Sequence, residues 1–544
     1  MNGADAVAKC LELEGVKTVY GYPGVAICPV YDSLMETGIH TVLVRSEANA
    51  AHAASGMARI SGEAGVCICT SGPGATNLIT GIATAYADSI PLVCITGQVK
   101  LDLIGGDVFQ EADITGAAES FVKYSYLVRK ASDIPRIFRE AFHIATTGRR
   151  GPVLIDIPVD VQNTEIRKFE WPEEVNLRTY KPTFRGNPMQ IRKVVHALET
   201  CERPILYTGG GVHLCKAAPL VREFAEKYRI PVVSTMMGIG TMPSRHELYM
   251  GMAGNNGNLA ANKAIHDSDV VILVGARLAD RAVNDPQKML AHKTLIHIDV
   301  DPAEIGKNAA CDLPIVGDAR AIFEDMLKEE ITMKDITPWS MALREIRQKK
   351  SRRVVPERFT DPAVFVKTLS LAMDENAVYV ADVGQNQIWS CANVVMREGR
   401  FLTSGGMGTM GYALPAAIGA KMADRSRQVV SVSGDGGFQM AMMELATMNQ
   451  EDLDLRIVVF NNAALGMVRE FQMFSLNRRY TMVDLNGGPD YEKLADAYGI
   501  RYMRIDDNEG IEKKVQEFLS GTGSVLLEVT VDPDGVVRKA GGSK

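Results

Sequence analysis

Long apolar runs are missing from this chain of 544 residues. None approaches the roughly 20 consecutive apolar residues that a membrane-spanning helix needs, so we expect no membrane segment. The first residues, MNGADAVAKCLELEG, lack the basic start and apolar core of a signal peptide. They predict instead an amphipathic helix with Asn2 as its cap and Gly15 at its end.

Basic clusters are scarce too. The net charge is −7 and only RQKKSRR at 347–353 stands out, so we expect no nucleic-acid partner.

Zinc-site spacing is absent among the nine cysteines. Cys67 and Cys69 form C-x-C inside an apolar stretch, and no second pair follows at a spacing that would complete a zinc site. Buried free thiols in a reducing compartment explain these cysteines best, which predicts a cytoplasmic protein. No short repeat or low-complexity tract is present either.

What the chain does have is a regular alternation of strand-like and helical segments, which predicts an α/β fold of open parallel sheets. Composition shifts divide it into three blocks, residues 1–163, 188–335 and 363–534. Charged, irregular connectors separate the blocks. The first and third blocks are similar in size, but their sequences alone do not prove a duplication.

The stretch 429–462 carries the most specific pattern. VVSVS and RIVVF predict two buried strands, and FQMAMMELATM predicts a helix between them. Such a βαβ unit is right-handed and its strands are parallel neighbours, so Gly434-Asp435-Gly436 and Asn461-Asn462 come together at one sheet edge. A carboxylate, an amide oxygen and closely approaching glycine backbone suit Mg²⁺ with a diphosphate. A tight turn and an unrelated loop are the alternative.

This pairing of GDG with NN resembles the signature of thiamine-diphosphate enzymes. With that cofactor, Glu47 in the first block has a catalytic role. A carboxylate that shares a proton with the aminopyrimidine ring makes the exocyclic amine of that ring a base, and this base can remove the thiazolium C2 proton. Alanines, glycines and His52 around Glu47 predict an apolar setting for this exchange, and Ser46 is the expected cap of the helix. The alternative is that Glu47 only complements the helix dipole, by about 0.3–1 kcal/mol.

Several other turns have two interpretations each. FQEAD at 109–113 either faces a small substrate with Phe109 and Gln110 or is a surface loop. Met410, in GGMGTMGYALPAAIGA, either fills the core or wedges the cofactor into a bent shape, with the Gly408 carbonyl accepting from its amino group. In the second block, the glycine turn at 208–211 and the acidic residues Asp299 and Asp318 indicate a nucleotide-sized ligand. For Arg277 and Arg281 a structural salt bridge is the alternative.

From NGADAV to about residue 530 the chain resembles the catalytic subunit of acetohydroxyacid synthases, also called acetolactate synthases. The resemblance rests on GYPG, FQEAD, GRRGPVLIDIP, GARLADR, HIDVDPAEIGKN, PIVGD, GGMGTMGYALPAAIGA, GDGGFQM, FNN and LGMV. It implies that the three blocks are a pyrimidine-binding, a central FAD-binding and a diphosphate-binding domain. It also implies a homodimer or homotetramer with active sites shared between subunits, and it leaves room for a small regulatory subunit.

Members of that family decarboxylate pyruvate on thiamine diphosphate and join the two-carbon unit to a second 2-ketoacid. The product is 2-acetolactate from pyruvate or 2-aceto-2-hydroxybutyrate from 2-ketobutyrate, in branched-chain amino-acid biosynthesis. The resemblance gives catalytic roles to Glu47, Gln110, Phe109, Arg281, Met410 and Phe471, with Arg281 pairing with the second ketoacid's carboxylate. It assigns Mg²⁺ to Asp435, Asn462 and the backbone of Ala464.

The remaining cofactor contacts are also carried over by position. For thiamine diphosphate they are Gly24, Glu47, Val383, Gly384, Gln385, Asn386, Gly408, Met410, Gly434, Asp435, Gly436, Gly437, Asn462, Ala464, Gly466 and Met467. For FAD they are Arg149, Gly209, Gly210, Gly211, Thr235, Met236, Gly251, Met252, Gly275, Ala276, Arg277, Asp299, Val300, Gly317, Asp318 and Ala319.

The chain also departs from the family pattern near the expected site. Phe471 stands where the family has a tryptophan that favours 2-ketobutyrate, so the second-substrate preference stays open. A related thiamine–FAD enzyme that acts on another 2-ketoacid, or that passes electrons to FAD, is the second hypothesis. A catalytically silent binding or regulatory relative is the third, and the presence of Glu47, Asp435 and Asn462 argues against it.

Overall fold

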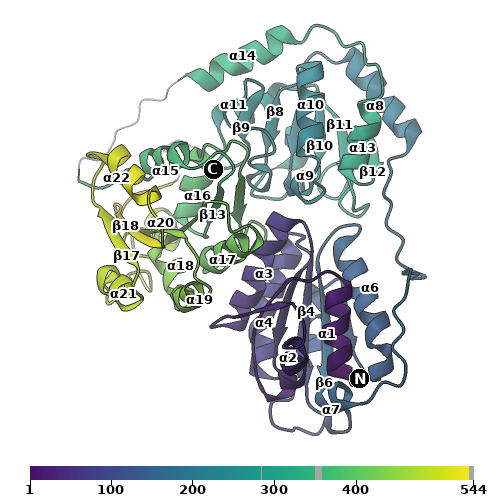
Figure 1. Cartoon of the computed structure of the whole chain (residues 1–544). Coiled ribbons are helices and arrows are strands. Elements are labelled where there is room, and N and C mark those ends of the chain that lie inside the picture. Colours follow the sequence, from purple (N-terminus) through teal and green to yellow (C-terminus); the bar gives the residue numbers. More distant parts are fainter. Residues whose placement is uncertain (284, 350–357, 538–544) are drawn as a thin grey trace.

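Three six-stranded sheets, each with all of its strands parallel, organise the computed structural model (Figure 1). The structure describes residues 1–283, 285–349 and 358–537. Residues 350–353 of the basic run therefore lie outside the described part. The three sheets with their covering helices confirm the predicted α/β fold. Among the described residues, no helix combines the length and the apolar character needed to cross a bilayer.

The first sheet has the strand order β2-β1-β3-β4-β6-β5. Its strands are β1 (Thr18–Tyr22), β2 (His40–Leu43), β3 (Gly65–Cys69), β4 (Leu92–Gln98), β5 (Tyr124–Leu127) and β6 (Pro152–Pro158). Its helices are α1 (Gly3–Leu13), α2 (Cys28–Leu34), α3 (Glu47–Ser61), α4 (Pro73–Ala87), α5 (Ile114–Ala118), α6 (Ile134–Thr146) and α7 (Val159–Asn163). We call this the first unit. Alternate residues of β3 point to opposite faces: Val66 and Ile68 pack with α1, α2 and α6, and Cys67 and Cys69 pack with α3 and α4.

Helix α1 begins and ends as the sequence predicted. The Asn2 side chain accepts from the backbone N–H of Asp5 at 2.9 Å, and the Asp5 carboxylate accepts from the backbone N–H of Asn2 at 2.8 Å. This capping box satisfies two of the backbone groups that a helix start leaves without partners. Gly15 follows the helix with a φ of +74°, which glycine adopts without strain.

The central sheet has the order β12-β11-β10-β7-β8-β9. Its strands are β7 (Pro204–Thr208), β8 (Val232–Ser234), β9 (Tyr249–Met252), β10 (Val270–Val274), β11 (Thr294–Asp299) and β12 (Leu313–Val316). Its helices are α8 (Pro188–Thr200), α9 (Gly210–Leu214), α10 (Ala218–Tyr228), α11 (Leu259–Asp267), α12 (Pro286–Leu290), α13 (Ala319–Met326) and α14 (Thr337–Gln348). Numbered from β7, the strand order is 3-2-1-4-5-6, the doubly wound arrangement that binds dinucleotides where the order reverses, here between β7 and β10.

Helix α14 lies in the stretch predicted to be a charged connector. Leu343 of this helix is buried in the core of the central unit, and Trp339 Nε1 donates to the carbonyl oxygen of Pro204 at 3.1 Å. The central unit therefore includes residues beyond 335, while the domain boundaries stay a prediction.

The third sheet has the order β14-β13-β15-β16-β18-β17. Its strands are β13 (Val378–Ala381), β14 (Arg400–Thr403), β15 (Val429–Gly434), β16 (Arg456–Asn461), β17 (Arg501–Ile505) and β18 (Val525–Thr530). Its helices are α15 (Pro362–Ala372), α16 (Gln385–Asn393), α17 (Ala413–Ala423), α18 (Asp435–Gln439), α19 (Leu445–Gln450), α20 (Gly466–Ser475), α21 (Tyr491–Ala497) and α22 (Ile511–Leu519). Numbered within each unit, the first and third sheets share the order 2-1-3-4-6-5. The structure thus shows a repeated topology that the sequence had left open.

The prediction of one continuous helix over FQMAMMELATM was wrong. Strands β15 and β16 are parallel neighbours as expected, but the segment between them forms α18, a short 3₁₀ helix (Met442–Glu444) and α19. The break at Ala441 turns Glu444 into the interior, where it hydrogen bonds to the first unit. A tertiary contact therefore overrides the helical spacing of this segment.

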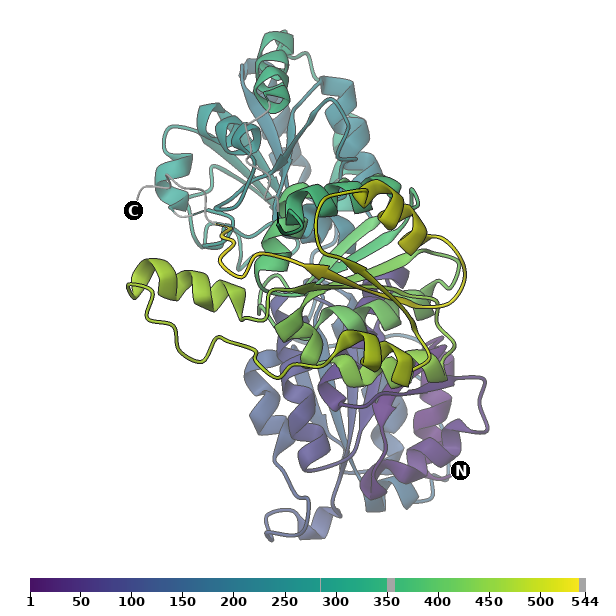
Figure 2. The ribbon, with the colours of Figure 1, turned by 90° about the vertical axis from the view of Figure 1, so that its left-hand side faces the viewer.

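The third unit packs on the first through α3 and α17, and the central unit lies beside both (Figure 1). Glycines make this close packing possible, because a Cβ on Gly56 would overlap the carbonyl oxygen of Ala416 and a Cβ on Gly419 would overlap that of Ala53. Seen from the side, α20 projects away from the body of the third unit (Figure 2).

Candidate active site

The carboxyl edge of the third sheet brings together the polar residues predicted to meet there. Asp435 begins α18 directly after β15, and Asn462 follows the neighbouring strand β16. Asp435 is 3% exposed. Its Oδ1 accepts from the N–H of Gly436 at 2.9 Å, while Oδ2 has no hydrogen-bond partner within the described residues. A buried carboxylate oxygen without a partner is costly unless a ligand satisfies it.

The donors around Asp435 are hard oxygens. Burial raises the pKa of the Asp435 carboxyl to about 6, and the backbone N–H groups of Gly436 and residues 462–464 offset part of that rise. The Asn462 amide oxygen accepts from the N–H of Ala464 at 3.1 Å. No group of three or more His, Cys, Asp or Glu residues that could hold a metal occurs in the part of the chain that the structure describes. A cation at this edge would therefore be held by one carboxylate and neutral oxygens, a set that Mg²⁺ accepts.

Gln385 connects this edge to the end of the chain. Its side-chain oxygen accepts from Asn462 Nδ2 at 3.3 Å, and its Nε2 donates to Glu470 Oε2 at 3.1 Å and to the carbonyl oxygen of Gly535 at 2.8 Å. The next residue, Asn386, is buried, and its Oδ1 has no partner among the described residues. Two buried polar oxygens, from Asp435 and Asn386, are thus left for a ligand at the same edge.

Met410 reaches the glycine turn beside Asp435. A Cβ built on Gly436 would lie 3.4 Å from Met410 Cε and 2.7 Å from Leu465 Cδ2. Met410 is half-buried, so it is not part of the closed core. Gly408, in the same loop, has a φ of +71°, and a Cβ there would meet nothing within 4 Å. The loop therefore leaves the space beside Gly408 open, while Met407 is exposed and Met410 lies against Gly436.

Glu47 stands at a second edge, in the first unit. It begins α3, is half-buried, and accepts from Asn77 Nδ2 at 3.0 Å. A Cβ on Gly74 would lie 3.2 Å from Glu47 Oε1, so the first turn of α4 lies against this carboxylate. Ser46 occupies the N-cap position, but its side chain makes no capping hydrogen bond, contrary to the prediction.

Two other turns of the first unit lie in the same region as Glu47. A Cβ on Gly24 would touch Thr70, and a Cβ on Gly72 would lie 2.9 Å from the Gln110 backbone. Thr70 Oγ1 is buried and has no partner among the described residues. Gln110 has a φ of +61°, a left-handed conformation that is uncommon for a side chain-bearing residue and often marks a functional turn. Phe109 beside it is 88% exposed in the single chain.

Within the described residues, Glu47 hydrogen bonds to Asn77 and makes no bond to Asp435 or Asn462. The two edges belong to different units of the chain. What joins those units near Glu47 is Glu444, which accepts from the Arg45 N–H and the Asn49 side chain, both at 2.9 Å. A single chain therefore contains both halves of the predicted site, one in the first unit and one in the third.

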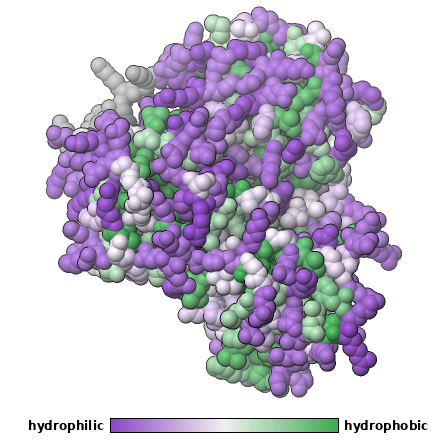
Figure 3. All heavy atoms as spheres, in the orientation of Figure 1, coloured by the Kyte–Doolittle hydropathy of each residue, from purple (hydrophilic) through white to green (hydrophobic). Residues whose placement is uncertain are grey.

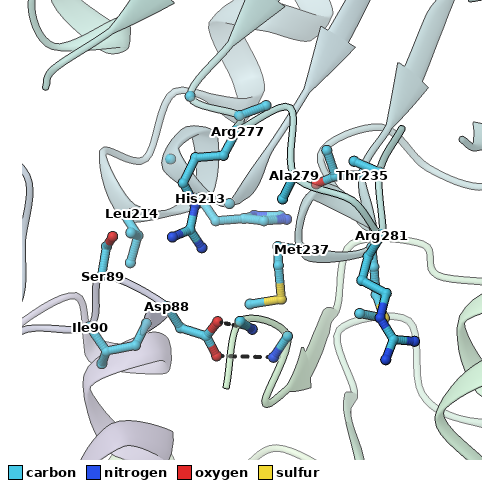
Figure 4. A pocket seen from close by; sticks show the side chains of 18 of the residues that line it. Asp88, Ser89, Ile90, His213, Leu214, Thr235, Met237, Arg277, Ala279 and Arg281 are labelled. Carbon is cyan, nitrogen blue, oxygen red and sulfur yellow. Dashed lines mark hydrogen bonds between the residues drawn. The ribbon is translucent and has the colours of Figure 1, made fainter. Parts of the chain in front are cut away.

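A cavity of about 710 Å³ lies where the three units meet (Figure 4). Its volume is in the range of cofactor pockets. It opens at the switch point of the central sheet, beside Gly210 after β7 and Gly275 after β10. Arg59 and Asp88 of the first unit line its wall, as do Val383 and residues 405–408 of the third.

Asp88 ties the glycine-rich loop of the third unit to the first unit. Its carboxylate accepts from the backbone N–H groups of Gly405 at 3.1 Å and of Gly406 at 2.7 Å (Figure 4). Arg59 Nη2 donates to Asp88 Oδ2 at 2.7 Å, and both side chains are almost fully buried. The position of the loop that carries Gly408 and Met410 is therefore fixed at the cavity wall.

Arginines supply positive charge around the cavity. Arg149 Nη1 donates to Glu304 Oε1 at 2.8 Å and to Asp301 Oδ2 at 3.2 Å. Arg277 Nη2 donates to the carbonyl oxygen of Ala87 at 2.6 Å, and the exposed Arg281 side chain has no ion-pair partner among the described residues. Within the part of the chain that the structure describes, neither Arg277 nor Arg281 forms the structural salt bridge that was the alternative for them.

Comparison with known proteins relates both edges and the cavity to one family. The model of the thiamine pyrophosphate enzyme N-terminal TPP binding domain matches residues 1–117, that of the central domain residues 191–326, and that of the C-terminal TPP binding domain residues 382–529. The probable acetolactate synthase large subunit of Methanocaldococcus jannaschii is 45% identical over 98% of this chain and 92% of its own length. The chain belongs to the acetolactate synthase family.

Other members of the acetolactate synthase family are similar over the same span. The acetolactate synthase of Arthrospira platensis is 42% identical, and the acetolactate synthase isozyme 3 large subunit of Escherichia coli strain K12 is 40% identical. Each comparison covers 98% of this chain and 95% of the relative. The first and third units of this acetolactate synthase family member are therefore thiamine-diphosphate-binding domains, which identifies the ligand expected at the edges described above.

Most of the residues carried over for FAD in the acetolactate synthase family line the cavity. These are Arg149, Gly210, Gly211, Thr235, Met236, Met252, Gly275, Ala276, Arg277, Asp299, Val300, Asp318 and Ala319, and Arg281 lines it as well. Gly209, Gly251 and Gly317 do not line it. A Cβ on Gly209 would overlap the carbonyl oxygen of Gly275, so this glycine serves the close packing of two chain segments behind the wall.

Two acidic residues at the cavity already have local roles. Burial raises the pKa of the Asp299 carboxyl to about 6, and its Oδ1 accepts from the N–H of Asp301 at 2.9 Å. Asp318 caps α13 by accepting from the backbone N–H groups of Arg320 and Ala321. Each of these local hydrogen bonds uses Oδ1 only, so Oδ2 of Asp299 and Oδ2 of Asp318 take no part in them.

Sequence reasoning missed several cavity residues, most of them from the first and third units. Arg59, Asp88, His213, Gln387 and Arg400 all line the cavity. One signal was available for two of them: Arg59 and Asp88 are charged residues within largely apolar helical segments, and such charges are buried only when they are paired. Which residues they pair with depends on how the units pack.

Proposed function

We propose that this protein is an acetolactate synthase that uses thiamine diphosphate to decarboxylate pyruvate and to join the two-carbon unit to a second 2-ketoacid. With a second pyruvate the product is 2-acetolactate; with 2-ketobutyrate it is 2-aceto-2-hydroxybutyrate, and both serve branched-chain amino-acid biosynthesis. The observation that carries the proposal is the buried Asp435 Oδ2, which has no partner among the described residues at the third sheet's switch point.

Bound thiamine diphosphate supplies an electron sink for the loss of carbon dioxide. The residues of this chain hold and activate it. Asp435, the Asn462 amide and the Ala464 backbone hold Mg²⁺, in keeping with their oxygen donors. Glu47 shares a proton with the aminopyrimidine ring, and Asn77, which donates to Glu47 Oε2 at 3.0 Å, fixes the orientation of that carboxylate. Met410, beside Gly436, would support the cofactor once it is bound.

Each active site is built from two copies of the chain, with Glu47 of one copy facing Asp435 of the other. The location of the two edges in different units of the chain supports this arrangement. So does exposed apolar surface near both edges: Val25 is 85% exposed and Phe109 88%, and Phe471 on the projecting α20 is 51% exposed. Apolar patches interrupt the otherwise hydrophilic face in Figure 3, over the lower part of the first unit and over the third unit. Exposed apolar surface of this kind marks an interaction site.

The central cavity holds FAD. Its volume and the strand order of its sheet suit a dinucleotide. The three domains are then pyrimidine-binding (1–163), FAD-binding (188–335, with α14 packed on it) and diphosphate-binding (363–534).

Because relatives are named large subunits, a small regulatory subunit is the expected partner. We place the protein in the cytoplasm.

The substrate end of the site comprises Gln110 and Phe109 from the first unit, Arg281 from the central unit and Phe471 from α20. Arg281 pairs with the carboxylate of the second ketoacid through its planar guanidinium. Phe471 is the residue that sets the pocket for the second substrate, and its ring is smaller than the tryptophan of typical members.

Product analysis tests the proposal. Purified protein with pyruvate, thiamine diphosphate, Mg²⁺ and FAD should form acetolactate, and added 2-ketobutyrate reports the second-substrate preference. Glu47→Gln should lower turnover by roughly 10²- to 10⁴-fold with cofactor affinity largely kept. The exposed Glu63→Gln is the matched control. Normal turnover of Glu47→Gln would remove Glu47 from the mechanism.

One observation favours a second candidate, a pyruvate-oxidase-like enzyme. The cavity is lined by Val383 and Gly408, which also belong to the predicted thiamine-diphosphate contacts, so a flavin there would lie near that cofactor. In the same assay, acetate or acetyl phosphate with peroxide or reduced acceptor, and no acetolactate, would establish this candidate instead.

A further inference from the structure

Glu444 is a fully buried carboxylate of the third unit that binds the first unit. Its Oε1 accepts from the backbone N–H of Arg45 and from Asn49 Nδ2, both at 2.9 Å. Its Oε2 accepts from the Thr447 hydroxyl at 2.6 Å. The residue is 0% exposed, so water cannot take over these bonds. Both oxygens are thus committed to protein donors, and two of the three donors belong to the other unit.

The two partners in the first unit are Arg45, two residues before Glu47, and Asn49, two residues after it. Helix α3 begins at Glu47, and the expected cap, Ser46, makes no side-chain hydrogen bond to the helix start. The first N–H groups of a helix need acceptors, and a carboxylate near a helix start is favourable. Glu444 accepts from the N–H of Arg45, one residue before the cap, and from the Asn49 side chain, so it places a negative charge near the start of α3 and fixes the chain on both sides of Glu47.

The same segment of the third unit makes one further hydrogen bond and one further polar contact to the chain before Glu47. The Thr447 hydroxyl lies 3.1 Å from the carbonyl oxygen of Leu43, and Arg45 Nη2 donates to Gln450 Oε1 at 3.0 Å. At its other end this segment begins with Asp435, nine residues before Glu444. One continuous stretch thus runs from the proposed magnesium ligand to the residues on both sides of Glu47.

We propose that Glu444 is a positioning residue: it sets the orientation of Glu47 and so links the diphosphate half of one active site to the activating carboxylate of the other. The inference rests on the proposed function, in which Glu47 serves the site that contains Asp435 of the second copy. Glu444 touches neither substrate nor cofactor and acts through residues 45–49. An error of about 1 Å in a catalytic group can cost 10²-fold in rate, so a loosened α3 start slows activation.

Glu444→Gln tests the positioning role, because it removes the negative charge that the Arg45 N–H and the Asn49 amide face, while the Thr447 hydroxyl can turn to accept from the new amide. The readout is the rate at which the C2 proton of bound thiamine diphosphate exchanges with deuterium, followed by NMR after acid quench. We expect exchange to slow by roughly 10- to 100-fold, with thiamine-diphosphate affinity and thermal midpoint close to wild type. Asn49→Ala removes only the hydrogen bond from Asn49 to Glu444 and should slow exchange less. It tests the same role if Glu444→Gln does not fold.

A matched control exists at the same interface. Glu451 is 8% exposed, belongs to the third unit, and lies 2.6 Å from His40 Nε2 of the first unit, away from Glu47. Glu451→Gln should leave the exchange rate near wild type. Equal slowing in Glu451→Gln and Glu444→Gln would mean that any loosening of the interface has this effect, and the inference would fail.

Glu47→Gln separates failure of this inference from failure of the proposed function. If Glu47→Gln exchanges at the normal rate, Glu47 has no activating role and the proposed mechanism is wrong. If Glu47→Gln slows exchange and neither Glu444→Gln nor Asn49→Ala does, only the positioning role is overturned.

Assemblies that combine two different variant chains show which active site the Glu444→Gln substitution slows. A Glu444→Gln chain paired with an Asp435→Asn chain keeps one site made of an unperturbed Glu47 and an intact Asp435, so that site should exchange at the normal rate. The same chain paired with a Glu47→Gln chain keeps only the site served by the loosened Glu47, which should be slow. The reverse pattern would place the action of Glu444 on its own diphosphate half and contradict the link between sites.

Discussion

At the scale of single residues, Arg59 and Asp88 join the units around the cavity. Asp88 holds the N–H groups of Gly405 and Gly406, and Arg59 donates both to Asp88 and to the carbonyl oxygen of Thr403 at 2.8 Å. Each charge satisfies the other in a place that water does not reach. A buried pair of this kind is costly to break from one side, because the remaining charge has no partner.

We therefore expect Asp88→Asn to lower the free energy of unfolding by about 3–5 kcal/mol. The purified variant should also carry less flavin, since Gly405 and Gly406 belong to the cavity wall. Thermal unfolding and the fluorescence of flavin released by heating measure the two effects. Asp102→Asn changes an exposed carboxylate and is the control; similar midpoints for both variants would contradict the structural role of Asp88.

His52 makes the first unit sensitive to acid. Burial, with the nearby Arg59, lowers the pKa of His52 to about 4, and its Nδ1 has no partner among the described residues. The unfolded chain takes up a proton near pH 6.5, but the folded chain does so only near pH 4. The stability that this residue contributes is therefore present above about pH 6.5 and is lost as the pH falls toward 4.

His52 should account for roughly 2 kcal/mol of the stability lost between about pH 7.5 and about pH 5. His52→Gln should then lose less stability than the wild type over that interval, whatever its absolute stability. Denaturant unfolding at the two pH values measures the difference. His196→Gln, at a side chain that is 80% exposed, should follow the wild-type pH dependence. The same dependence in all three proteins would exclude His52.

At the scale of elements, the crossing of α3 and α17 decides how the first and third units pack. Gly56 and Gly419 let each helix approach the backbone of the other, and any side chain there would overlap a carbonyl oxygen. A backbone oxygen inside a helix cannot turn aside as a flexible side chain can. The packing therefore depends on two residues that have no side chain.

Gly419→Ala should lower the free energy of unfolding by about 3 kcal/mol, the upper end of the usual cost of overpacking. It should also slow thiamine C2–H exchange, because α3 carries Glu47 at its start. Gly38→Ala is the control, since Gly38 is exposed and a Cβ there meets nothing within 4 Å. A stable, active Gly419→Ala protein would show that the two helices can move apart without loss.

At the scale of the whole molecule, a two-copy site predicts complementation between inactive variants. Glu47→Gln and Asp435→Asn should each be nearly inactive alone. Coexpressed, they should recover roughly one quarter of the wild-type activity, because random pairing makes half of the dimers mixed and each mixed dimer has one intact site of two. Acetolactate formation by the purified mixture measures this. No recovery would contradict a site shared between copies.

The sequence alone was enough for the local features. Apolar β-branched runs predict β15 and β16, and Asn2 with Asp5 predicts the start of α1, because these signals act between neighbours in the chain. The βαβ rule then places Asp435 and Asn462 at one edge, since a right-handed crossover leaves little choice. Specific strings also identified the family, which the relatives confirm.

The tertiary structure decided what depends on distant segments meeting. Asp88 and Gly405 are far apart in sequence, and so are Glu444 and Arg45, and no local pattern states that they pair. The helix predicted over FQMAMMELATM breaks because Glu444 turns inward to those partners, which helical spacing cannot reveal. Spacing reports which side of an element is apolar, whereas the partner of a buried charge is set by the packing of whole units.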